Sequence, residues 1–444
     1  MNKRNHCVAA LVGALVFGIS PAFAKVTAEQ AATLRTTLTP LGGERAGNKE
    51  GTIPPWEGGW TAERSFADIL AKDKPILQIT AKNLDQHVAK LSEGVQALLK
   101  KYPETFRLDV YPTRRTAAAP TWVYENTLGN ATQATITEGG LSLTGAYGGI
   151  PFPIPQDGYE VMWNHTLRVY PESINFSFRN IVGAADGTHT VAAESVQDAQ
   201  FPYYMKGGNA ESWNGEYVLA RQAQVAPPFR AGESLVIRDA VDVSKSRQAW
   251  QYLVGQRRVR RAPTVGYDTP DFVSSGANYF DEVFGFYGAL DRYEWKLLGK
   301  QEMFVPYNNN AYATVKVDQV VGPKHLNPEG LRWELHRVWV VEATVANGRR
   351  HAVPKRRFYV DEDSWVVMMV DGFDASGKLW RANHGISFVM PEVPALWSGA
   401  TMIYNLQAGS WILNTSLNDF GVKIVSPRPD AFFTGDALGA GGIR

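Results

Sequence analysis

Apolar and polar residues alternate with a period of two through most of the chain, from about Thr121 onward. Clusters of Gly, Asn, Asp and Pro interrupt this alternation about every ten residues, which is typical of short antiparallel strands joined by tight turns. The clearest strand patterns lie at 141–144, 167–170, 174–179, 235–238, 250–254, 332–343, 356–361 and 364–371. The pattern predicts a mainly β protein with a few helices, of the α+β class, built around one large antiparallel sheet.

The second half of the chain continues as a meander of strands. Asn347-Gly348 is a hairpin-type turn directly after the long strand pattern at 332–343. The strand pattern at 364–371 is apolar on both faces, so we expect both of its faces to be covered. A ligand cavity or a helix layer on the concave face would provide that cover, and a plain sandwich core would give the same pattern.

Helical patterns lie mainly before this region. Thr27 is a suitable N-cap for a helix that Pro40 and the glycines after it would end. Asn83 can cap a second helix over 84–101, where apolar residues recur at helical spacing. One further short helix is expected near 279–287.

The stretch at 47–59 is dominated by Gly, Pro and Asn, which predicts an ordered loop and no regular element. Trp56 and Trp60 suggest that this loop packs against the body of the protein. We found no repeat of fixed period and no linker that separates two domains. We therefore expect residues 25–444 to form one large domain with a helical and loop extension over about 25–120.

Residues 1–24 have the three parts of a secretory signal peptide. Lys3 and Arg4 supply positive charge, and an apolar stretch leads to an Ala-Phe-Ala cleavage site. This stretch is shorter than the roughly 20 residues that span a bilayer, so cleavage after Ala24 is expected in preference to a membrane anchor. Cys7, the only cysteine, lies at the front of the apolar stretch and not directly after it. We therefore expect no lipid anchor and a mature chain without thiols.

The charge balance gives no support for a nucleic-acid partner. The chain has a formal net charge of +1, and removing the two cations of the signal peptide takes it to about −1. No other apolar run approaches the length of a membrane span. A soluble protein that works outside the cytoplasm is expected.

The sequence contains no recognisable catalytic motif, and we predict no catalytic residue, no cofactor and no metal site. The histidines in the second half, which include His336 and His351, lack metal-ligand spacing. Paired carboxylates could serve as acid and base in glycoside cleavage or could hold a hard cation, although caps and turns explain them with fewer assumptions. The candidates are Asp268, Asp271, Asp281, Glu282 and Asp291.

The densest charge in the chain is a basic run at 256–261. Its arginines are candidates for docking an acidic partner or anionic headgroups. A solvated edge strand that charge protects from aggregation explains the run equally well. The docking candidates are Arg257, Arg258, Arg260 and Arg261.

Aromatic residues make up 11% of the chain, with 13 tryptophans among them, and they are spread through the whole sequence. Core packing explains most aromatics in most proteins. Some could instead line a cavity for an apolar or sugar-like ligand. The candidates for such a cavity are Trp250, Tyr252, Trp295, Trp333, Trp339, Trp365 and Met369.

Several segments together resemble the DUF1329 proteins, a proteobacterial family of unknown function. The segments that carry the resemblance are 38–56, 249–263, 291–300 and 305–308. The resemblance covers essentially the whole mature chain. It implies a fold like that of the lipoprotein carriers LolA and LolB, a strongly curved antiparallel half-barrel with helices on its concave side.

The resemblance also carries functional expectations. Members of the family tend to be encoded beside RND-type exporters and a partner family of outer-membrane β-barrel proteins. The leading hypothesis is therefore a periplasmic carrier or adaptor for a lipid or other hydrophobic cargo, with peripheral contact to a membrane. The family has no agreed catalytic residues to transfer to this chain. A cell-envelope glycan-binding protein or glycan-acting enzyme, and a structural subunit of an envelope complex, are the alternatives.

Overall fold

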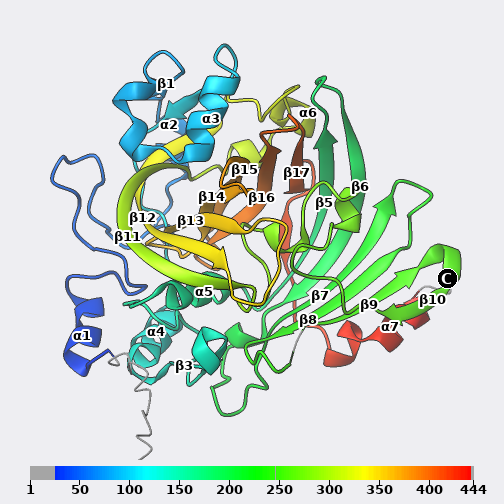
Figure 1. Ribbon diagram of the computed structural model, residues 1–444. Coiled ribbons are helices and arrows are strands. Elements are labelled where there is room, and N and C mark those ends of the chain that lie inside the picture. The colour runs from blue at the N-terminus through cyan, green and yellow to red at the C-terminus, as the bar shows by residue number, and fades with distance from the viewer. Residues whose placement is uncertain (1–25, 246, 442–444) are drawn as a thin grey trace, which may run out of the picture.

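A single open antiparallel sheet dominates the computed structural model of the protein, which describes residues 26–245 and 247–441. The predicted signal peptide and Cys7 lie outside the described residues. The central strands follow one another as a meander, interrupted once where β17 pairs with β5. The sheet is strongly curved (Figure 1), which confirms the predicted half-barrel.

The order of the strands explains how one sheet spans most of the chain. The path runs β1-β2-β12-β13-β14-β15-β16-β17-β5-β6-β7-β8-β9-β10, with β11 paired to β12 and β18 paired to β5. Neighbouring strands are antiparallel except for the short parallel pair β2–β12. The bounds are β1 Leu77–Ile79, β2 Leu108–Val110, β5 Ser173–Gly183, β6 His189–Gln200, β7 Glu216–Ala226, β8 Ser234–Ala240, β9 Gln248–Leu253, β10 Arg258–Arg261, β11 Tyr293–Pro306, β12 Arg332–Val345, β13 Lys355–Asp361, β14 Val367–Phe373, β15 Leu379–Met390, β16 Ala395–Asn405, β17 Trp411–Ser416 and β18 Val422–Ile424.

Short helices and a small hairpin surround this sheet. Helices α4 and α5 pack into the hydrophobic cluster of the concave, inner face, as predicted for the half-barrel. Helices α3 and α7 pack against the outer face, at different places. In the described part of the chain, no helix is both long and apolar enough to cross a membrane. The bounds are α1 Ala28–Ala32, α2 Ala67–Lys72, α3 Glu93–Lys101, α4 Thr121–Gln133, α5 Gly158–Thr166, α6 Val317–Val320 and α7 Gly435–Gly441, with the hairpin β3 Thr135–Thr137 and β4 Ser142–Thr144.

The first two predicted helices have different outcomes. Thr27 does cap α1, in a capping box with Gln30, although the α-helix is only five residues long. The helix predicted over 84–101 is wrong in its first half, which forms two 3-10 turns. The α-helix begins after Ser92, whose hydroxyl accepts a hydrogen bond from the Val95 N–H at 3.2 Å. A hydroxyl N-cap satisfies backbone donors that a continuous helix would use internally, so it marks a helix start.

The sequence pattern missed α4, because the strand alternation was expected to begin at Thr121. This helix depends on polar tertiary contacts that are invisible in a hydrophobic pattern. The Ile150 N–H donates to Thr127 Oγ1 at 2.9 Å, and the Asn130 amide reaches the carbonyl oxygen of Tyr147 at 3.4 Å. The expected strand at 167–170 is also wrong, since these residues are irregular between α5 and β5.

Alternate residues of the sheet separate two cores. On β8, Leu235 and Ile237 face inward, whereas Val236 faces outward toward α7. The inner face carries most of the aromatic residues, and the outer face packs against α3 through Val95 and Leu98. Each face buries a continuous apolar layer, which is the main favourable contribution to the fold.

A segment without regular strands crosses the inner face between β10 and β11. We call residues 262–291 the plug segment. It contains only two 3-10 turns, Phe272–Ser274 and Phe280–Glu282, so the helix expected near 279–287 is reduced to one turn. Loops longer than about 12–15 residues are uncommon in compact folds, and ordered ones are usually functional, with binding loops and lids among them.

Candidate ligand cavity

An apolar cavity of about 100 Å³ lies between the inner face of β5–β8 and the plug segment. Its walls are mostly aromatic and aliphatic, with a few polar groups among them, which is the usual composition of a small-molecule site. The apolar lining includes Phe176, Phe178, Ala199, Phe201, Tyr217, Ala220, Leu235, Ile237 and Trp397 from the sheet and the segments joining its strands. The polar lining includes Arg168, Asn180, Gln197, Gln222, Asp271, Asn414 and Thr415.

The plug segment forms one wall of this cavity. It contributes Asp271, Val273, Phe280, Val283, Phe284, Phe286, Tyr287 and Gly288. Three of its non-glycine residues, Tyr267, Ser275 and Phe284, have φ values of 52°, 56° and 54°. A left-handed conformation is unfavourable for such residues, above all for a bulky aromatic, and persists only where surrounding contacts hold it. The plug segment is therefore held down by its contacts and not by local preference.

Buried ion pairs hold the plug segment against the sheet. Asp281 contacts His351 Nε2 at 2.9 Å and Arg356 Nη2 at 3.0 Å, and Glu282 accepts from Arg381 Nη2 at 2.7 Å. Burial alone would raise the pKa of Asp281, but the charge of Arg356 and the contact with His351 outweigh it and lower the pKa to about 2. The Asp281 carboxylate is thus ionised at neutral pH and anchors the plug segment.

A polar group lies at the plug side of the cavity. Asp271 caps the first 3-10 turn by accepting from the Val273 N–H at 2.9 Å, and its side chain is buried. Ser274 donates to Asn278 Oδ1, to which the Asn414 amide also donates at 3.4 Å. Burial raises the pKa of Asp271 to about 6, because desolvation disfavours the carboxylate more than the hydrogen bonds from Val273 and Asn278 stabilise it.

A buried arginine forms another part of the lining. Arg168 is 4% exposed and donates from Nη1 to the His165 carbonyl oxygen at 2.7 Å. Its guanidinium lies 4.6 Å from the ring centroid of Tyr170. No carboxylate of the described chain pairs with it, and burial lowers the pKa of Arg168.

None of the seven predicted cavity residues lines this cavity. Trp250 and Tyr252 project from the outer face of β9, where α7 and the turn before it cover them. Trp333 and Met369 belong to the core on the outer face, and Trp295 belongs to the core on the inner face. Five of the seven residues lie on predicted strands, whereas Trp295 lies on the unpredicted β11 and Trp365 lies in a turn. The alternation alone could not tell which face of each strand bounds the empty space.

Trp339 and Trp365 form a stacked pair, with ring centroids 6.3 Å apart. Trp365 does not lie on a strand as predicted, since it occupies the turn before β14 with a φ of 62°. Its indole N–H donates to the Leu41 carbonyl oxygen at 2.8 Å, which fixes residues near the N-terminus to the sheet. The pair therefore has a packing role. A period of two would place Trp333 and Trp339 on one face of β12, but they contact different hydrophobic clusters.

The residues that do line the cavity were only partly visible in the sequence. Phe176 and Phe178 lie in a strand that the alternation predicted, and their spacing places both on one face. The aromatic residues of the plug segment had no periodic pattern to mark them. Their density within an irregular segment, from Phe280 to Tyr287, was the available indication.

The carboxylates proposed for glycan cleavage do not form a facing pair in an open cleft. Asp281 and Glu282 are neutralised by buried arginines, as described above. Asp268 accepts from the Ala352 N–H at 2.8 Å, and Asp291 lies 3.8 Å from Arg349. These groups fix the plug segment and its ends in place, so the geometry gives no support to the glycan-acting alternative.

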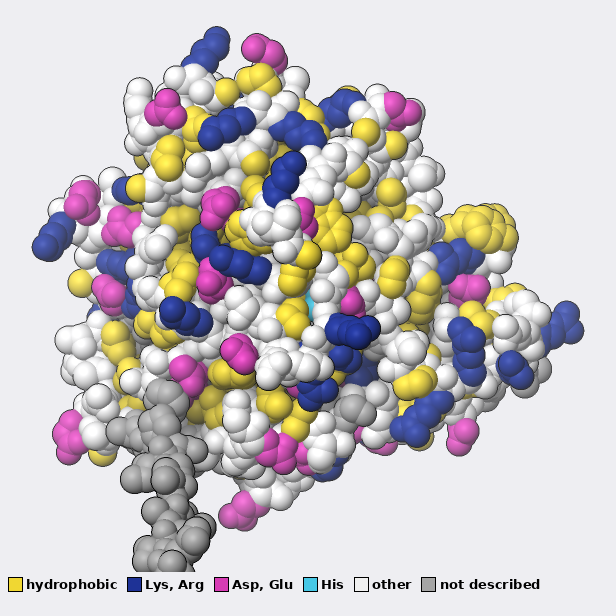
Figure 2. All heavy atoms as spheres, in the orientation of Figure 1, with side chains coloured by type: hydrophobic (Ala, Val, Ile, Leu, Met, Phe, Trp, Pro, Cys, Tyr) yellow, Lys and Arg dark blue, Asp and Glu magenta, His cyan; other side chains and the backbone are white. Residues whose placement is uncertain are grey.

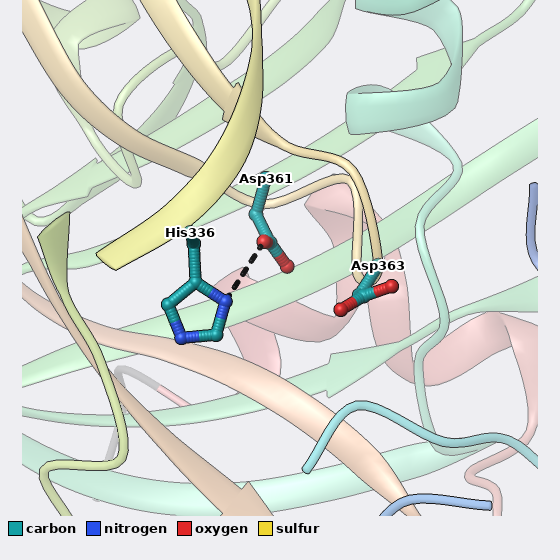
Figure 3. A group of neighbouring side chains, drawn as sticks. All are labelled: His336, Asp361 and Asp363. Atoms are coloured by element: carbon teal, nitrogen blue, oxygen red, sulfur yellow. Dashed lines mark ion pairs between the residues drawn. The ribbon is translucent and has the colours of Figure 1, made fainter. Parts of the chain in front are cut away.

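His336 lies near two aspartates, Asp361 and Asp363, in a buried cluster (Figure 3). Its Nδ1 is 3.8 Å from Asp361 Oδ1, and its Nε2 is 3.0 Å from Glu334 Oε2. Both oxygens of Asp363 are already bound by the Arg115 guanidinium, at 2.6 and 2.8 Å. Arg115 therefore supplies the neutralising cation at Asp363, which fits a structural network better than a metal site.

The basic run occupies β10, at one end of the strand order. Its four arginines are exposed and have no carboxylate partner in the described chain. Arg258 and Arg260 contact only the neutral side chains of Gln256 and Gln251, and Arg261 lies 5.9 Å from the Trp250 ring centroid. An unpaired row of cations at a sheet edge attracts anions and also discourages pairing between sheets.

The fold and the site define a half-barrel protein whose inner face, closed by a plug segment, surrounds an apolar cavity. The family model described as "Protein of unknown function (DUF1329)" matches residues 78–439. The "Uncharacterized protein PA3922" of Pseudomonas aeruginosa is 39% identical over 402 residues, which cover 88% of each chain. The chain belongs to the DUF1329 family, as its sequence motifs predicted.

Two solved structures are also similar. A DUF1329 family protein from Desulfovibrio piger is 13% identical with a TM-score of 0.44, and the match covers 63% of this chain and 97% of that chain. The LolA superfamily protein NE2245 from Nitrosomonas europaea is 11% identical with a TM-score of 0.37, and the match covers 64% of this chain and 100% of that chain.

Proposed function

We propose that this protein is a periplasmic carrier or adaptor that binds a lipid or another hydrophobic cargo on the inner face of its sheet. The observation that supports this function best is the aromatic cavity between β5–β8 and the plug segment. Burial of an acyl chain there would contribute about 0.8 kcal/mol per methylene group. No chemical step is required for such a role.

The plug segment must move for a long chain to enter. An engineered apolar cavity of about 150 Å³ accommodates benzene, so a cavity of about 100 Å³ is too small for an acyl chain as it stands. Displacement of the plug segment would give the cargo access to the inner face of β5–β8. Loop movements of this kind commonly open and close binding sites.

We propose further that the β10 end of the sheet docks on an anionic membrane surface. Exposed apolar side chains accompany the arginines there: Phe229 at the tip of the β7–β8 loop is 81% exposed, and Val225 is 52% exposed. Gly232 of the same loop packs close to Val254, next to the basic run. Figure 2 shows basic and apolar side chains together along the side of the molecule that β7–β10 occupy in Figure 1. Cationic and apolar groups side by side suit a headgroup interface.

This docking region contacts the plug segment directly. Arg230, in the loop that carries Phe229, donates to the Phe272 carbonyl oxygen at 2.7 Å. A membrane that displaces the loop would weaken this contact and favour release of the plug segment.

We propose an RND-type exporter and an outer-membrane β-barrel protein as the partners that deliver or collect the cargo. This proposal follows the gene neighbours expected for the family.

Native mass spectrometry of the protein purified from periplasm tests the carrier function. We expect a bound lipid-like mass, together with saturable binding of a fluorescent fatty acid to the emptied protein. A protein that is consistently empty and fails to bind the fluorescent fatty acid would refute the proposal. A stable stoichiometric protein partner found without any ligand would favour the structural-subunit alternative instead.

A further inference from the structure

Arg168 differs from the other buried arginines on the inner side of the sheet. Arg356 pairs with Asp281 at 3.0 Å, and Arg381 pairs with Glu282 at 2.7 Å. Arg168 is equally buried and lines the cavity, yet the described chain gives it no carboxylate. Its contacts are the His165 carbonyl oxygen and the face of Tyr170.

An unpaired buried guanidinium is costly for a protein to keep. Desolvation of such an ion costs several kcal/mol, and arginine does not escape this cost by losing its proton. A guanidinium has five N–H donors, and one hydrogen bond to a carbonyl oxygen satisfies only part of that capacity. The neighbouring ring of Tyr170 offsets part of the cost through a cation–π contact. The remaining charge faces a cavity whose other walls are mainly apolar.

An anionic group at the end of an apolar chain complements this arrangement. A carboxylate or phosphate can accept two parallel hydrogen bonds from a guanidinium, and such bidentate, charge-assisted pairs are strong when water is excluded. The apolar remainder of the ligand would contact Phe178, Phe284 and Trp397, which line the same cavity. Asp271 also lines the cavity, but it is bound to the plug segment by the Val273 N–H and does not neutralise Arg168.

We propose that Arg168 binds the anionic headgroup of the cargo, so that the natural ligand is an amphiphile with a carboxylate or phosphate group at the end of an apolar chain. This inference rests on the carrier function proposed above and narrows its ligand class. A fatty acid and a lipid phosphate share the required chemistry. The roles divide simply: the aromatic wall holds the chain, and Arg168 selects the headgroup.

The test compares three probes with the same chain: hexadecanoate, hexadecyl phosphate and hexadecanol. Each is titrated into the emptied protein by displacement of a fluorescent fatty acid. We expect the wild type to bind at least one anionic probe about 10- to 100-fold more tightly than hexadecanol, the range that a hydrogen bond to a charged group provides. The anion that is preferred distinguishes a fatty acid from a lipid phosphate.

Variants assign the preference to Arg168. Arg168→Met keeps the length of the side chain without its charge, and should lose the preference while binding hexadecanol as the wild type does. Arg168→Lys keeps the charge without the planar fork, and should retain part of the preference. Arg35→Met, in the exposed 3-10 turn Thr33–Arg35, removes a cation that lies outside both the cavity lining and the β10 docking region, and should leave the preference unchanged.

The outcomes separate this inference from the carrier function. Wild-type protein that binds hexadecanol as tightly as both anions would overturn the headgroup inference and leave the carrier function intact. A preference that persists in Arg168→Met would also overturn it. Wild-type protein that binds none of the three probes would contradict the carrier function itself.

Discussion

Replacement of Asp281 by Asn tests whether the plug segment opens as a unit. Asp281 is 2% exposed, and its pKa of about 2 lies below the ordinary 3.8 because Arg356 and His351 stabilise the carboxylate. This lowering corresponds to roughly 2–3 kcal/mol of stabilisation. Asp281→Asn also leaves Arg356 buried without its counter-ion, so a loss of about 2–4 kcal/mol is expected.

The pH dependence of this effect has a definite sign. A carboxylate with a lowered pKa contributes its stabilisation above the ordinary pKa and loses it as the pH falls through the folded-state value. The difference between wild type and Asp281→Asn should therefore be full at pH 7. It should shrink as the pH falls from about 4 toward 2. Urea unfolding over this pH range measures it.

Hydrogen exchange shows where the stability is lost. The amides of Asp281 and Tyr287 are hydrogen-bonded within the plug segment, to the carbonyl oxygens of Tyr267 and Asp281. In Asp281→Asn these amides should exchange faster than the amides of the central strand β14, and a fluorescent fatty acid should enter faster. Local opening has this signature because low-stability segments exchange without global unfolding.

Asp73→Asn is the matched control. Asp73 is half-buried and also contacts two arginines, Arg114 at 2.7 Å and Arg332 at 2.8 Å, but it lies outside the plug segment. It should destabilise the protein without selective exchange in the plug segment. Equal acceleration of exchange in plug and β14 for Asp281→Asn would refute a separately opening plug.

Three further outcomes are expected. Asp271→Asn should stabilise the protein more at pH 7.5 than at pH 4.5, by about 2 kcal/mol in urea unfolding. The raised pKa of the Asp271 carboxyl, about 6, contributes stability at low pH that is lost as the pH rises. A pH-independent difference between the two proteins would contradict this. Arg168→Met should raise the free energy of unfolding of the empty protein by about 1–3 kcal/mol, because it removes an uncompensated buried charge. A clear loss of stability in this variant would argue that other groups of the protein already compensate the Arg168 charge. The double variant Arg258→Ser/Arg260→Ser should weaken binding to anionic vesicles about 30-fold at low salt, at about 1 kcal/mol per arginine, and Phe229→Ala should weaken it further. Neutral vesicles are the control, and unchanged vesicle co-sedimentation would contradict membrane docking.

The strand alternation predicted the architecture because a period of two determines which residues share a sheet face. The meander from 332 to 371 is present as β12, β13 and β14, with the expected turn at Asn347-Gly348. The long strand β11 was not recognised, since its first part, Tyr293–Leu297, is followed by a bulge before Gly299. A bulge shifts the alternation by one residue, so a single pattern does not fit the whole strand.

The helices were harder to predict than the sheet, for a physical reason. Helix α4 is held by Thr127 and Asn130, polar residues that the sequence alone assigns to a surface or a turn. Helix α5 has a local indication in the sequence: Asp157 caps it by accepting from the Glu160 N–H at 2.9 Å, which is the spacing of an N-terminal cap.

The cavity depended on information that no local pattern contains. Strand periodicity places Phe176 and Phe178 on one face, but only the path of the plug segment decides that this face borders empty space. The same applies to Arg168, which lies in an irregular connection and differs from other arginines only by its missing carboxylate. The predicted tryptophans are large and apolar, and they fill space in the cores.

Filling the cavity tests the central claim most directly. Ala220 lines the cavity from the inner face of β7, and Ala223 lies on the opposite face of the same strand. The measurement is the equilibrium affinity for a fluorescent fatty acid in the wild type, in Ala220→Leu and in the control Ala223→Leu. We expect Ala220→Leu to lose at least tenfold in affinity while it stays folded, and Ala223→Leu to bind as the wild type does. Equal affinity in all three proteins would show that the ligand does not occupy this cavity.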